Sequence, residues 1–346
     1  MNRTAVIMHA PYRVGVCREE MPPAGPGEVI VQCELSAISA GTELLFYKGQ
    51  VPPDMTIDAG LSSLVGPARY PLRYGYAAVG KVTALGPNVP GDVLGRRVFC
   101  FHPHASHAAL RSADVVPVPD DIENRDALFL ANMETAVTLV LDGRPAVGEA
   151  VAVLGQGVVG LLTAALLSRH PLRSLFSVDP LPQRRAASLD AGVRAAFDSA
   201  DIDALKSRLA VDSGGAMADL VFELSGDPSA LNVAIDLTGF GGRIVLGSWY
   251  GTRPVAVNLG GRFHRSRIRL ISSQVSTLPA DATARWDRTR RIATAWEMAR
   301  SIRPSCYITH EIPVERAADA YELLDRRPWE AIQVVLTYEG VKASNE

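Results

Sequence analysis

The feature that most constrains the fold of this chain is a glycine-rich turn between a short apolar run and a helical segment. Residues 151–154 lead directly into Gly155-Gln-Gly157-Val-Val-Gly160, and residues 161–168 have the composition of a buried helix. In such a turn the first glycine permits the tight bend, the second lets the backbone approach a pyrophosphate, and the third allows close packing of helix on strand. The pattern predicts a dinucleotide-binding β-α-β unit. The residues expected at the phosphates are Gly155, Gly157, Val158, Val159 and Gly160.

An acidic residue follows the turn at the expected spacing. The next apolar run, residues 174–178, ends at Asp179, about 20 residues after the last glycine of the turn. A carboxylate there hydrogen-bonds the adenosine ribose hydroxyls and repels a 2′-phosphate, so we expect NAD(H) in preference to NADP(H). Arg184 is a further candidate cofactor contact, although Arg184 and Arg185 are also explained as solvated helix charges. A structural glycine turn that has lost its ligand is the alternative interpretation.

The length of 346 residues exceeds what one hydrophobic core usually supports, which predicts two domains. Residues 1–125 contain short β-type runs separated by Pro-Gly and Gly-Asp turns, a pattern typical of a barrel-like β domain. Residues 126–273 contain nearly continuous apolar strands alternating with helices, which indicates a parallel sheet covered on both faces. The α/β fold class therefore combines a β domain with a doubly wound domain, and residues 274–346 follow with two helical segments and a final strand.

Charge and cysteine usage narrow the class of partner. The formal net charge is −2, so no overall field favours nucleic acid or an anionic membrane. The longest apolar run, residues 151–167, is marginal for crossing a bilayer and is explained by the glycine turn. The four cysteines are far apart and form no Cys-x-x-Cys pair, and the first ten residues do not read as a secretory signal. We expect a cytoplasmic protein that acts on a small molecule, with neither a nucleic-acid nor a membrane partner. The cysteines are Cys17, Cys33, Cys100 and Cys306.

Several stretches across nearly the whole chain resemble the medium-chain dehydrogenase/reductase superfamily. Besides the glycine turn they are Gly27-Glu-Val-Ile-Val, Gly41-Thr42-Glu43, residues 75–82, Gly95-Arg-Arg-Val-Phe, Phe222-Glu-Leu-Ser-Gly226 and Gly241-Gly-Arg-Ile-Val-Leu-Gly247. The resemblance implies a GroES-like domain flanking a Rossmann domain, with residues 274–346 returning to the first domain and the ligands in the cleft between the two. It also implies cofactor contacts from Ser225, Gly247 and Thr135, and a homodimer joined edge to edge through the Rossmann sheet near residues 255–269.

The motifs that hold catalytic zinc in many members of this superfamily are altered here. A Cys-Gly-Ser/Thr-Asp motif corresponds to Ala40-Gly41-Thr42-Glu43, and a Gly-His-Glu motif corresponds to Gly75-Tyr76-Ala77. The last ligand position falls on Ala131. An alanine side chain has no lone pair to donate, and zinc needs about four ligands, so the resemblance implies a zinc-independent member.

Two further groups of residues invite a ligand. Three histidines, His102, His104 and His107, stand in the region where many relatives hold a structural zinc, but no carboxylate or thiolate lies close to them in sequence. A polar loop near the mouth of the cleft, in contact with substrate, is the alternative. The arginines between Arg285 and Arg303 could bind a carboxylate or phosphate of the substrate, or form a solvated helix face.

Alcohol oxidation by hydride transfer needs a group that takes the hydroxyl proton. By the resemblance, Thr42 matches the residue that passes this proton toward solvent, and Tyr76 takes the place of a lost metal ligand. The hypothesis is a Thr42/Tyr76 acid-base pair, with Glu43 accepting a hydrogen bond from Tyr76 and orienting it, and with the nicotinamide near Thr135. The alternative for Tyr76 is a packed aromatic that fills a former cavity.

Within the superfamily, residues 36–45 are most similar to the branch typified by 2-desacetyl-2-hydroxyethyl bacteriochlorophyllide a dehydrogenase. The resemblance implies a zinc-independent, NAD(H)-dependent oxidoreductase that interconverts a secondary alcohol and a ketone in a biosynthetic pathway. Two alternatives stay open. One is a zinc-free enoyl or quinone reductase, and the other is a non-catalytic nicotinamide-binding sensor, which predicts cofactor binding without turnover.

Overall fold

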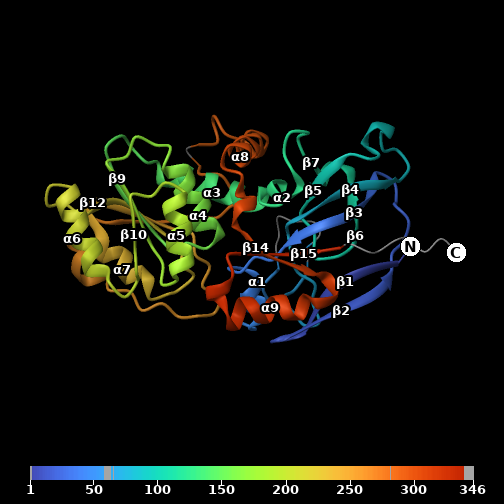
Figure 1. The fold of residues 1–346 in the computed structure, drawn as a ribbon, viewed down its shortest axis with the longest axis horizontal. Helices are drawn as coiled ribbons and strands as arrows, with labels where there is room; N and C mark the ends of the chain where they lie inside the picture. The colour runs from blue at the N-terminus through green and yellow to red at the C-terminus, as the bar shows by residue number, and fades with distance from the viewer. Residues whose placement is uncertain (1, 58–63, 65, 281, 339–346) are drawn as a thin grey trace. The chain divides into compact units, whose positions relative to one another are not determined.

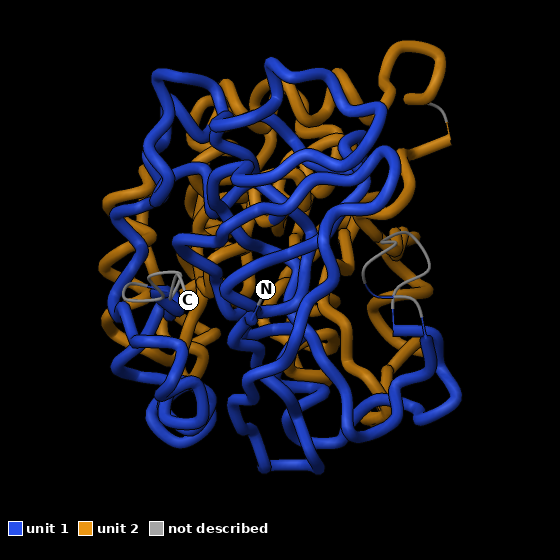
Figure 2. The backbone as a smooth tube through the Cα atoms, turned by 90° about the vertical axis from the view of Figure 1, so that its right-hand side faces the viewer, with its two compact units in different colours: residues 1–131, 299–346 blue, residues 132–298 orange. Residues whose placement is uncertain are grey.

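Two separate stretches of the chain, residues 1–131 and 299–346, form one structural unit (unit 1), and residues 132–298 form the other (unit 2) (Figure 2). The structure is a computed structural model that describes residues 2–57, 64, 66–280 and 282–338. The sequence predicts domain boundaries after residues 125 and 273, whereas the units of the structure meet after residues 131 and 298. The second boundary differs more, because residues 274–298 belong to unit 2.

A buried ion pair accounts for the position of the second boundary. Arg291 on α8 (Arg288–Ile302) donates to the Glu134 carboxylate on α3 (Leu130–Gly143), with 2.6 Å between Nη2 and Oε1. Arg291 also donates to Thr138 Oγ1 and to the carbonyl of Val275. The first part of the predicted Arg-rich helix is therefore anchored on unit 2. The sequence suggested either a solvated helix face or a substrate anion as the surroundings of these arginines. Neither applies to Arg291, which is buried and bonded to Glu134.

Six parallel strands form the sheet of unit 2, in the order β10-β9-β8-β11-β12-β13. Figure 1 labels β9, β10 and β12 of this sheet. The bounds of the six strands are β8 (Ala150–Leu154), β9 (Ser174–Val178), β10 (Ala195–Phe197), β11 (Ala218–Glu223), β12 (Thr238–Leu246) and β13 (Arg269–Ser272). The chain first adds strands on one side of β8 and then on the other, so the strand order reverses between β8 and β11. Sheets of this kind bind ligands beyond the carboxyl ends of the strands at that switch point.

Alternate residues of β8 pack on opposite faces of this sheet. Val151 and Val153 belong to one apolar cluster with Leu167 of α4, whereas Ala152 belongs to another with Leu205 of α6. Burial on both faces explains why the strands are apolar at nearly every position, and the predicted doubly wound arrangement is confirmed. The helices of unit 2 besides α3 and the start of α8 are α4 (Val158–Leu167), α5 (Pro182–Asp190), α6 (Ile202–Asp212), α7 (Ala230–Leu237) and the π-helix η4 (Leu259–Phe263).

A seven-stranded sheet and a separate antiparallel hairpin, β1-β2, form the framework of unit 1. The strands are β1 (Asn2–Ala10), β2 (Arg13–Glu20), β3 (Glu28–Ala37), β4 (Ala78–Leu85), β5 (Arg97–Cys100), β6 (His107–Arg111), β7 (Val116–Pro117), β14 (Ile308–Pro313) and β15 (Gln333–Thr337). The C-terminal strand β15 pairs with β3, where Val335 lies opposite Ala37. The C-terminal stretch thus completes a sheet that the N-terminal stretch begins.

The helices of unit 1 are short. Besides the end of α8, the described residues of this unit form α1 (Glu43–Tyr47), α2 (Asn124–Ala127), α9 (Ala317–Arg326) and the 3-10 turns η2 (Gly91–Val93), η3 (Ser112–Asp114), η5 (Pro304–Tyr307), η6 (Val314–Arg316) and η7 (Pro328–Glu330). The second of the two helical segments expected within residues 274–346 is therefore a 3-10 turn followed by α9. In the part of the chain that the structure describes, no helix has both the length and the apolar character needed to cross a membrane.

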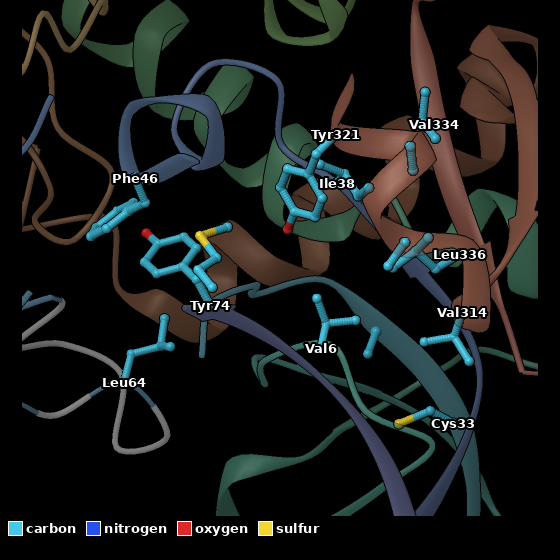
Figure 3. Close-up of a cluster of buried hydrophobic side chains, with 14 of the residues drawn as sticks. Val6, Cys33, Ile38, Phe46, Leu64, Tyr74, Val314, Tyr321, Val334 and Leu336 are labelled. Carbon is cyan, nitrogen blue, oxygen red and sulfur yellow. The ribbon is translucent and has the colours of Figure 1, made fainter. Parts of the chain in front are cut away.

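The core of unit 1 packs α1 and α9 against the sheet (Figure 3). Phe46 of α1 stacks on Tyr74 with 4.1 Å between ring centroids, and Tyr47 stacks on Tyr321 of α9. Phe46 and Tyr321 are fully buried, and burial of each side chain stabilises the fold by roughly 2–3 kcal/mol. This core holds α1, and with it the loop before α1 that carries the candidate catalytic hydroxyls.

Candidate functional site

The glycine turn of unit 2 has the shape of a phosphate cradle. Gly155 has φ of +87°, and a Cβ there would lie 2.4 Å from the Cα of Ser225. A Cβ at Gly160 would lie 2.0 Å from the carbonyl oxygen of Gly155, so both positions require glycine. Gly157, the N-cap of α4, has no protein atom within 4 Å of such a Cβ. Open space before the first turn of a helix suits a phosphate group, and the predicted turn is therefore built as a nucleotide site requires.

Asp179 lies at the carboxyl end of β9, and its side chain points back to the glycine turn. It is 3% exposed, and its Oδ2 accepts the backbone N–H of Gln156 at 2.7 Å. Its Oδ1 accepts the N–H of Leu181 at 2.9 Å. Each carboxylate oxygen retains a second lone pair, so the residue can still meet a ribose hydroxyl. Its first role, however, is to join β9 to the turn after β8.

The two arginines that follow Asp179 are not the solvated helix charges that the sequence suggested as one explanation. Arg185 donates to the carbonyls of Asp179 and Pro180 and to the Asp198 carboxylate. Arg184 is half-buried, and burial lowers the pKa of its guanidinium, while the nearby Asp179 raises it. Arg185 therefore binds the turn between β9 and α5, and Arg184 is partly withdrawn from solvent near Asp179.

A buried carboxylate that the sequence did not single out organises the end of β11. Glu223 is fully buried, and its Oε1 accepts the N–H of Ser225 at 2.8 Å and also the Ser225 hydroxyl. Its Oε2 accepts the Tyr250 hydroxyl at 2.6 Å. Burial and the Glu223 charge raise the pKa of Tyr250 far above its ordinary value, so the phenol keeps its hydrogen. Ser225, expected at the cofactor, is thereby held beside Gly155.

The remaining expected cofactor contacts also lie in unit 2. Gly247 follows β12, and a Cβ there would be 2.6 Å from Leu224 and 2.7 Å from Leu139. Val158 and Val159 are the first residues of α4. Thr135 lies on α3 and is partly exposed.

The loop before α1 in unit 1 is closed by a reciprocal pair of hydrogen bonds. The Ser39 N–H donates to Glu43 Oε1 at 2.7 Å, and the Glu43 N–H donates to the Ser39 carbonyl at 2.8 Å. Glu43 is fully buried, whereas Ser39 and Thr42 are half-buried. The carboxylate therefore supports the loop from beneath, and two hydroxyl side chains remain at its surface.

Ser39, which the sequence did not identify, is the acceptor for Tyr76. The Tyr76 hydroxyl donates to Ser39 Oγ at 2.6 Å, and the Thr42 N–H approaches the same oxygen at 3.4 Å. The expected hydrogen bond from Tyr76 to Glu43 does not form, because Glu43 lies below the loop and bonds other groups. Tyr76 is half-buried, so its ring is packed while its phenol joins the hydroxyls of this loop. Ser39, Thr42 and Tyr76 thus form a cluster of three hydroxyl residues, which we term the hydroxyl cluster.

The partners of Glu43 come from distant parts of the chain. Its Oε2 lies 2.9 Å from His104 Nε2 and also accepts the hydroxyl of Tyr321. His104 Nδ1 lies 2.7 Å from Ser36 Oγ, which in turn contacts the Tyr338 hydroxyl at 2.7 Å. Burial, reinforced by the Glu43 charge, raises the pKa of Tyr321 well above its ordinary value, so this phenol stays a donor.

The three histidines are buried, contrary to the expectation of a polar loop in contact with substrate. His104 is fully buried in the network just described. His102 Nδ1 contacts the carbonyl of Pro103 at 2.7 Å, and burial lowers the pKa of His102 to about 4. His107 Nδ1 contacts Ser106 Oγ at 3.1 Å. Within the described ranges, no three His, Cys, Asp or Glu side chains are grouped so that they could hold a metal ion.

The residues at the catalytic zinc positions do not fit a zinc ion. Ala40 and Ala131 offer no donor atom, and the third position is the Tyr76 phenol, which is hydrogen-bonded to Ser39. The carboxylate and the imidazole beneath this loop, Glu43 and His104, are fully buried and bond each other. Zinc prefers sulfur, imidazole and carboxylate ligands at roughly 2 Å, which this set does not provide.

Known proteins similar to this chain include solved structures of the same fold that contain NADH or NADP. Residues 158–290 match the family model described as zinc-binding dehydrogenase. The chain is 28% identical to the 2-desacetyl-2-hydroxyethyl bacteriochlorophyllide A dehydrogenase of Cereibacter sphaeroides, over 93% of this chain and 94% of that protein.

Two solved structures are similar over nearly the whole chain. One is a short chain alcohol dehydrogenase from E. coli CFT073 complexed with NADH, with a TM-score of 0.78 and 18% identity over 97% of this chain and 99% of that one. The other comes from Sinorhizobium meliloti 1021 and is bound to NADP, with a TM-score of 0.77 and 17% identity over 98% of this chain and 100% of that one. The likeness confirms the predicted fold class, a GroES-like β domain with a Rossmann domain.

Proposed function

We propose that this chain is a nicotinamide-dependent oxidoreductase of the medium-chain dehydrogenase/reductase superfamily that interconverts a secondary alcohol and a ketone without zinc. The observation that carries the proposal is the glycine turn from Gly155 to Gly160, which lies at the switch point of the sheet. Of its three glycines, Gly157 alone has open space where a side chain would stand. The match to a dehydrogenase family model over residues 158–290 supports it. The nicotinamide, when bound, would accept or supply the hydride.

The proton of the reaction is assigned to the hydroxyl cluster. In ketone reduction, Tyr76 gives its hydroxyl hydrogen to the oxygen that becomes the alcohol, and in the reverse direction the same oxygen takes that hydrogen back. The Ser39 hydroxyl, 2.6 Å from the phenol oxygen, can turn its own hydrogen toward the phenolate that this transfer leaves. Thr42 adjoins Ser39 Oγ through its backbone N–H, and we assign its hydroxyl the passage of the proton toward solvent. Glu43 contributes by holding Ser39 through the backbone rather than by touching Tyr76.

For the cofactor we propose NAD(H), with Asp179 and Arg184 at the adenosine ribose and Thr135, Ser225 and Gly247 toward the nicotinamide. The support for this preference is the carboxylate at the end of β9, which would repel a 2′-phosphate. The test is a fluorescence titration of the purified protein with NADH and NADPH. Tighter binding of NADH is expected, and at least tenfold tighter binding of NADPH would reverse the assignment.

The substrate class is proposed from the relative named for a bacteriochlorophyllide, whose printed name indicates oxidation at a hydroxyethyl group. The proposed substrate class is tested by assaying cyclic and tetrapyrrole secondary alcohols with NAD⁺. A parallel assay offers enones and quinones with NADH or NADPH. Turnover of a secondary alcohol supports the proposal. Turnover only of enones or quinones would assign a reductase, and tight cofactor binding with no turnover on either arm would assign a sensor.

Zinc independence is tested on the same active protein. We expect metal analysis to find zinc far below one equivalent per chain, and activity to survive a chelator. Stoichiometric zinc, together with activity that a chelator abolishes and zinc restores, would overturn this part of the proposal.

We also propose a homodimer formed through the Rossmann sheet. The strand β13 stands at the end of the six-stranded sheet, next to the 255–269 segment expected at the interface. On β13, Leu270 is 41% exposed, and an unpaired strand edge is able to add a second strand. Light scattering should give twice the chain mass, and Leu270→Lys should shift the protein toward the monomer.

A further inference from the structure

Beneath the hydroxyl cluster lies a second layer of polar residues that is closed to solvent. Glu43, His104, Ser36 and Tyr321 are each fully buried, whereas Ser39 and Tyr76 above them are half-buried. We propose that His104 is a positioning residue for Tyr76, acting through Glu43 and Ser39. This inference rests on the proposed function, because it assigns a role toward the group that we propose transfers the proton.

The first link holds His104 in one orientation. Its two ring nitrogens contact different partners, Glu43 Oε2 at 2.9 Å and Ser36 Oγ at 2.7 Å. The residue before Tyr76 also packs on the ring, because a Cβ at Gly75 would lie 3.0 Å from His104 Cδ2 and Nε2. A ring bonded at both nitrogens and covered by backbone has no room to rotate. A carboxylate oxygen can only accept, so the Nε2 that faces it must donate.

The second link carries this constraint to the loop before α1. The two oxygens of the Glu43 carboxylate accept from different donors. His104 and Tyr321 donate to Oε2, and the Ser39 N–H donates to Oε1 at 2.7 Å. A fully buried carboxylate needs all such donors, because an unpaired charge in a low-dielectric interior is strongly unfavourable. Loss of the His104 donor is therefore expected to turn the carboxylate and release the Ser39 backbone.

The third link reaches the phenol. Ser39 Oγ accepts the Tyr76 hydroxyl at 2.6 Å, so the direction of that O–H bond follows the position of Ser39. His104 and Tyr76 are thus joined by three consecutive hydrogen-bonded pairs, although the sequence separates them by 28 positions. His104 takes no part in the proton transfer itself. Its role is to keep the acceptor of the Tyr76 hydroxyl in place.

The experiment measures the environment of the Tyr76 phenol in the full-length protein without substrate. Incorporation of 3-fluorotyrosine labels all nine tyrosines, and Tyr76→Phe identifies the Tyr76 signal in the fluorine NMR spectrum. In His104→Leu the Tyr76 resonance is expected to shift and broaden, with a changed titration midpoint. In His104→Gln, where the amide nitrogen can replace Nε2 as the donor to Glu43, it is expected to return close to the wild-type position.

The control is Tyr338→Phe, which removes the hydroxyl at the far end of the same network, beyond Ser36. It should leave the Tyr76 resonance unchanged. A Tyr76 resonance that stays unchanged in His104→Leu would overturn the proposal, as would a shift that His104→Gln fails to reverse. If His104→Leu does not fold, Glu43→Met decides the question. A methionine side chain of similar length offers no oxygen to the Ser39 N–H, so an unchanged Tyr76 signal would equally overturn the proposal.

A kinetic measurement separates this inference from the proposed function. With a secondary alcohol that the wild type oxidises, His104→Leu should lower kcat roughly 10-fold to 100-fold, leave the KM for the cofactor unchanged, and be rescued by His104→Gln. Absence of any wild-type turnover would contradict the proposed function. The NMR result stands apart from that outcome, because it needs neither substrate nor cofactor.

Discussion

The ring and the hydroxyl of Tyr76 have different surroundings. Its ring packs edge-on against Tyr74 with 6.2 Å between centroids, so the aromatic part has a structural role whether or not the phenol is catalytic. The hydroxyl, however, is bonded to Ser39 at the partly exposed surface of the loop rather than inside the core. Removing the oxygen alone therefore separates the packing role from the chemical role.

Tyr76→Phe is expected to lower kcat about 100-fold, because a general acid-base group contributes on the order of 10²-fold or more. Cofactor affinity and the melting temperature should change little, since the ring is kept. Tyr74→Phe is the matched control, for it removes a hydroxyl from the neighbouring ring and should leave turnover unchanged. Turnover of Tyr76→Phe at the wild-type rate would reduce Tyr76 to a packed aromatic.

His102 predicts how the stability depends on pH. Burial lowers the pKa of His102 to about 4 from an ordinary value near 6.5, so the unfolded chain takes up the proton first as the pH falls. The free energy of unfolding should therefore decrease between about pH 6.5 and pH 4, by about 3 kcal/mol for this group. Urea unfolding at several pH values measures it. His102→Asn should flatten this part of the profile, whereas the exposed His264→Asn should not.

At the scale of elements, local signals predict β8, β9 and the glycine turn of unit 2. The strands β8 and β9 are buried at every position, so their apolar runs could be read directly, and the glycine turn between β8 and α4 is encoded by three residues. The hairpin β1-β2 has a weaker pattern because β2 has no fully buried residue.

The contacts of the candidate site were only partly predictable. Tyr76 and the 42–43 loop could be identified because they occupy motif positions, but the acceptor of Tyr76 depends on which loop atom faces it after folding. Glu43 meets His104 from 61 positions away and Tyr321 from 278 positions away. No local pattern encodes such pairs, since they depend on how α9 and the loop between β5 and β6 pack around α1. The sequence shows His104 only as one of three nearby histidines, whereas its contact with Glu43 exists only in the folded chain.

The glycine turn offers a test in which stability and binding respond differently. Gly157→Ala adds a methyl group where no protein atom lies within 4 Å, so the melting temperature should stay within about a degree of the wild type. The same methyl group occupies the space expected for the pyrophosphate, and we expect NADH affinity to fall at least about tenfold. Calorimetry measures both quantities. Gly160→Ala, whose Cβ would lie 2.0 Å from a carbonyl oxygen, should instead lower both.

For the whole molecule, we expect the two units to have different free energies of unfolding. The Arg291–Glu134 pair contributes to the stability of unit 2. Both side chains are nearly buried, with 6% and 5% of their side-chain surface exposed, and both belong to unit 2. Breaking such a pair leaves an unpaired buried charge, which costs about 3–5 kcal/mol. A protein with two units need not unfold in one transition, so the loss should be seen in the transition assigned to unit 2.

Arg291→Ala should therefore lower the unfolding free energy of unit 2 by about 3 kcal/mol in urea, with the transition followed by hydrogen exchange in β8 and β11. The double variant Arg291→Met with Glu134→Leu should recover most of this loss, because it removes both charges and keeps the volume. Arg300→Ala is the control: its pair with Asp121 in unit 1 is about half exposed, so the change should be below about 1 kcal/mol. If Arg291→Ala weakened unit 1 and left β8 and β11 protected, residues 274–298 would belong energetically to unit 1, where the sequence had placed them.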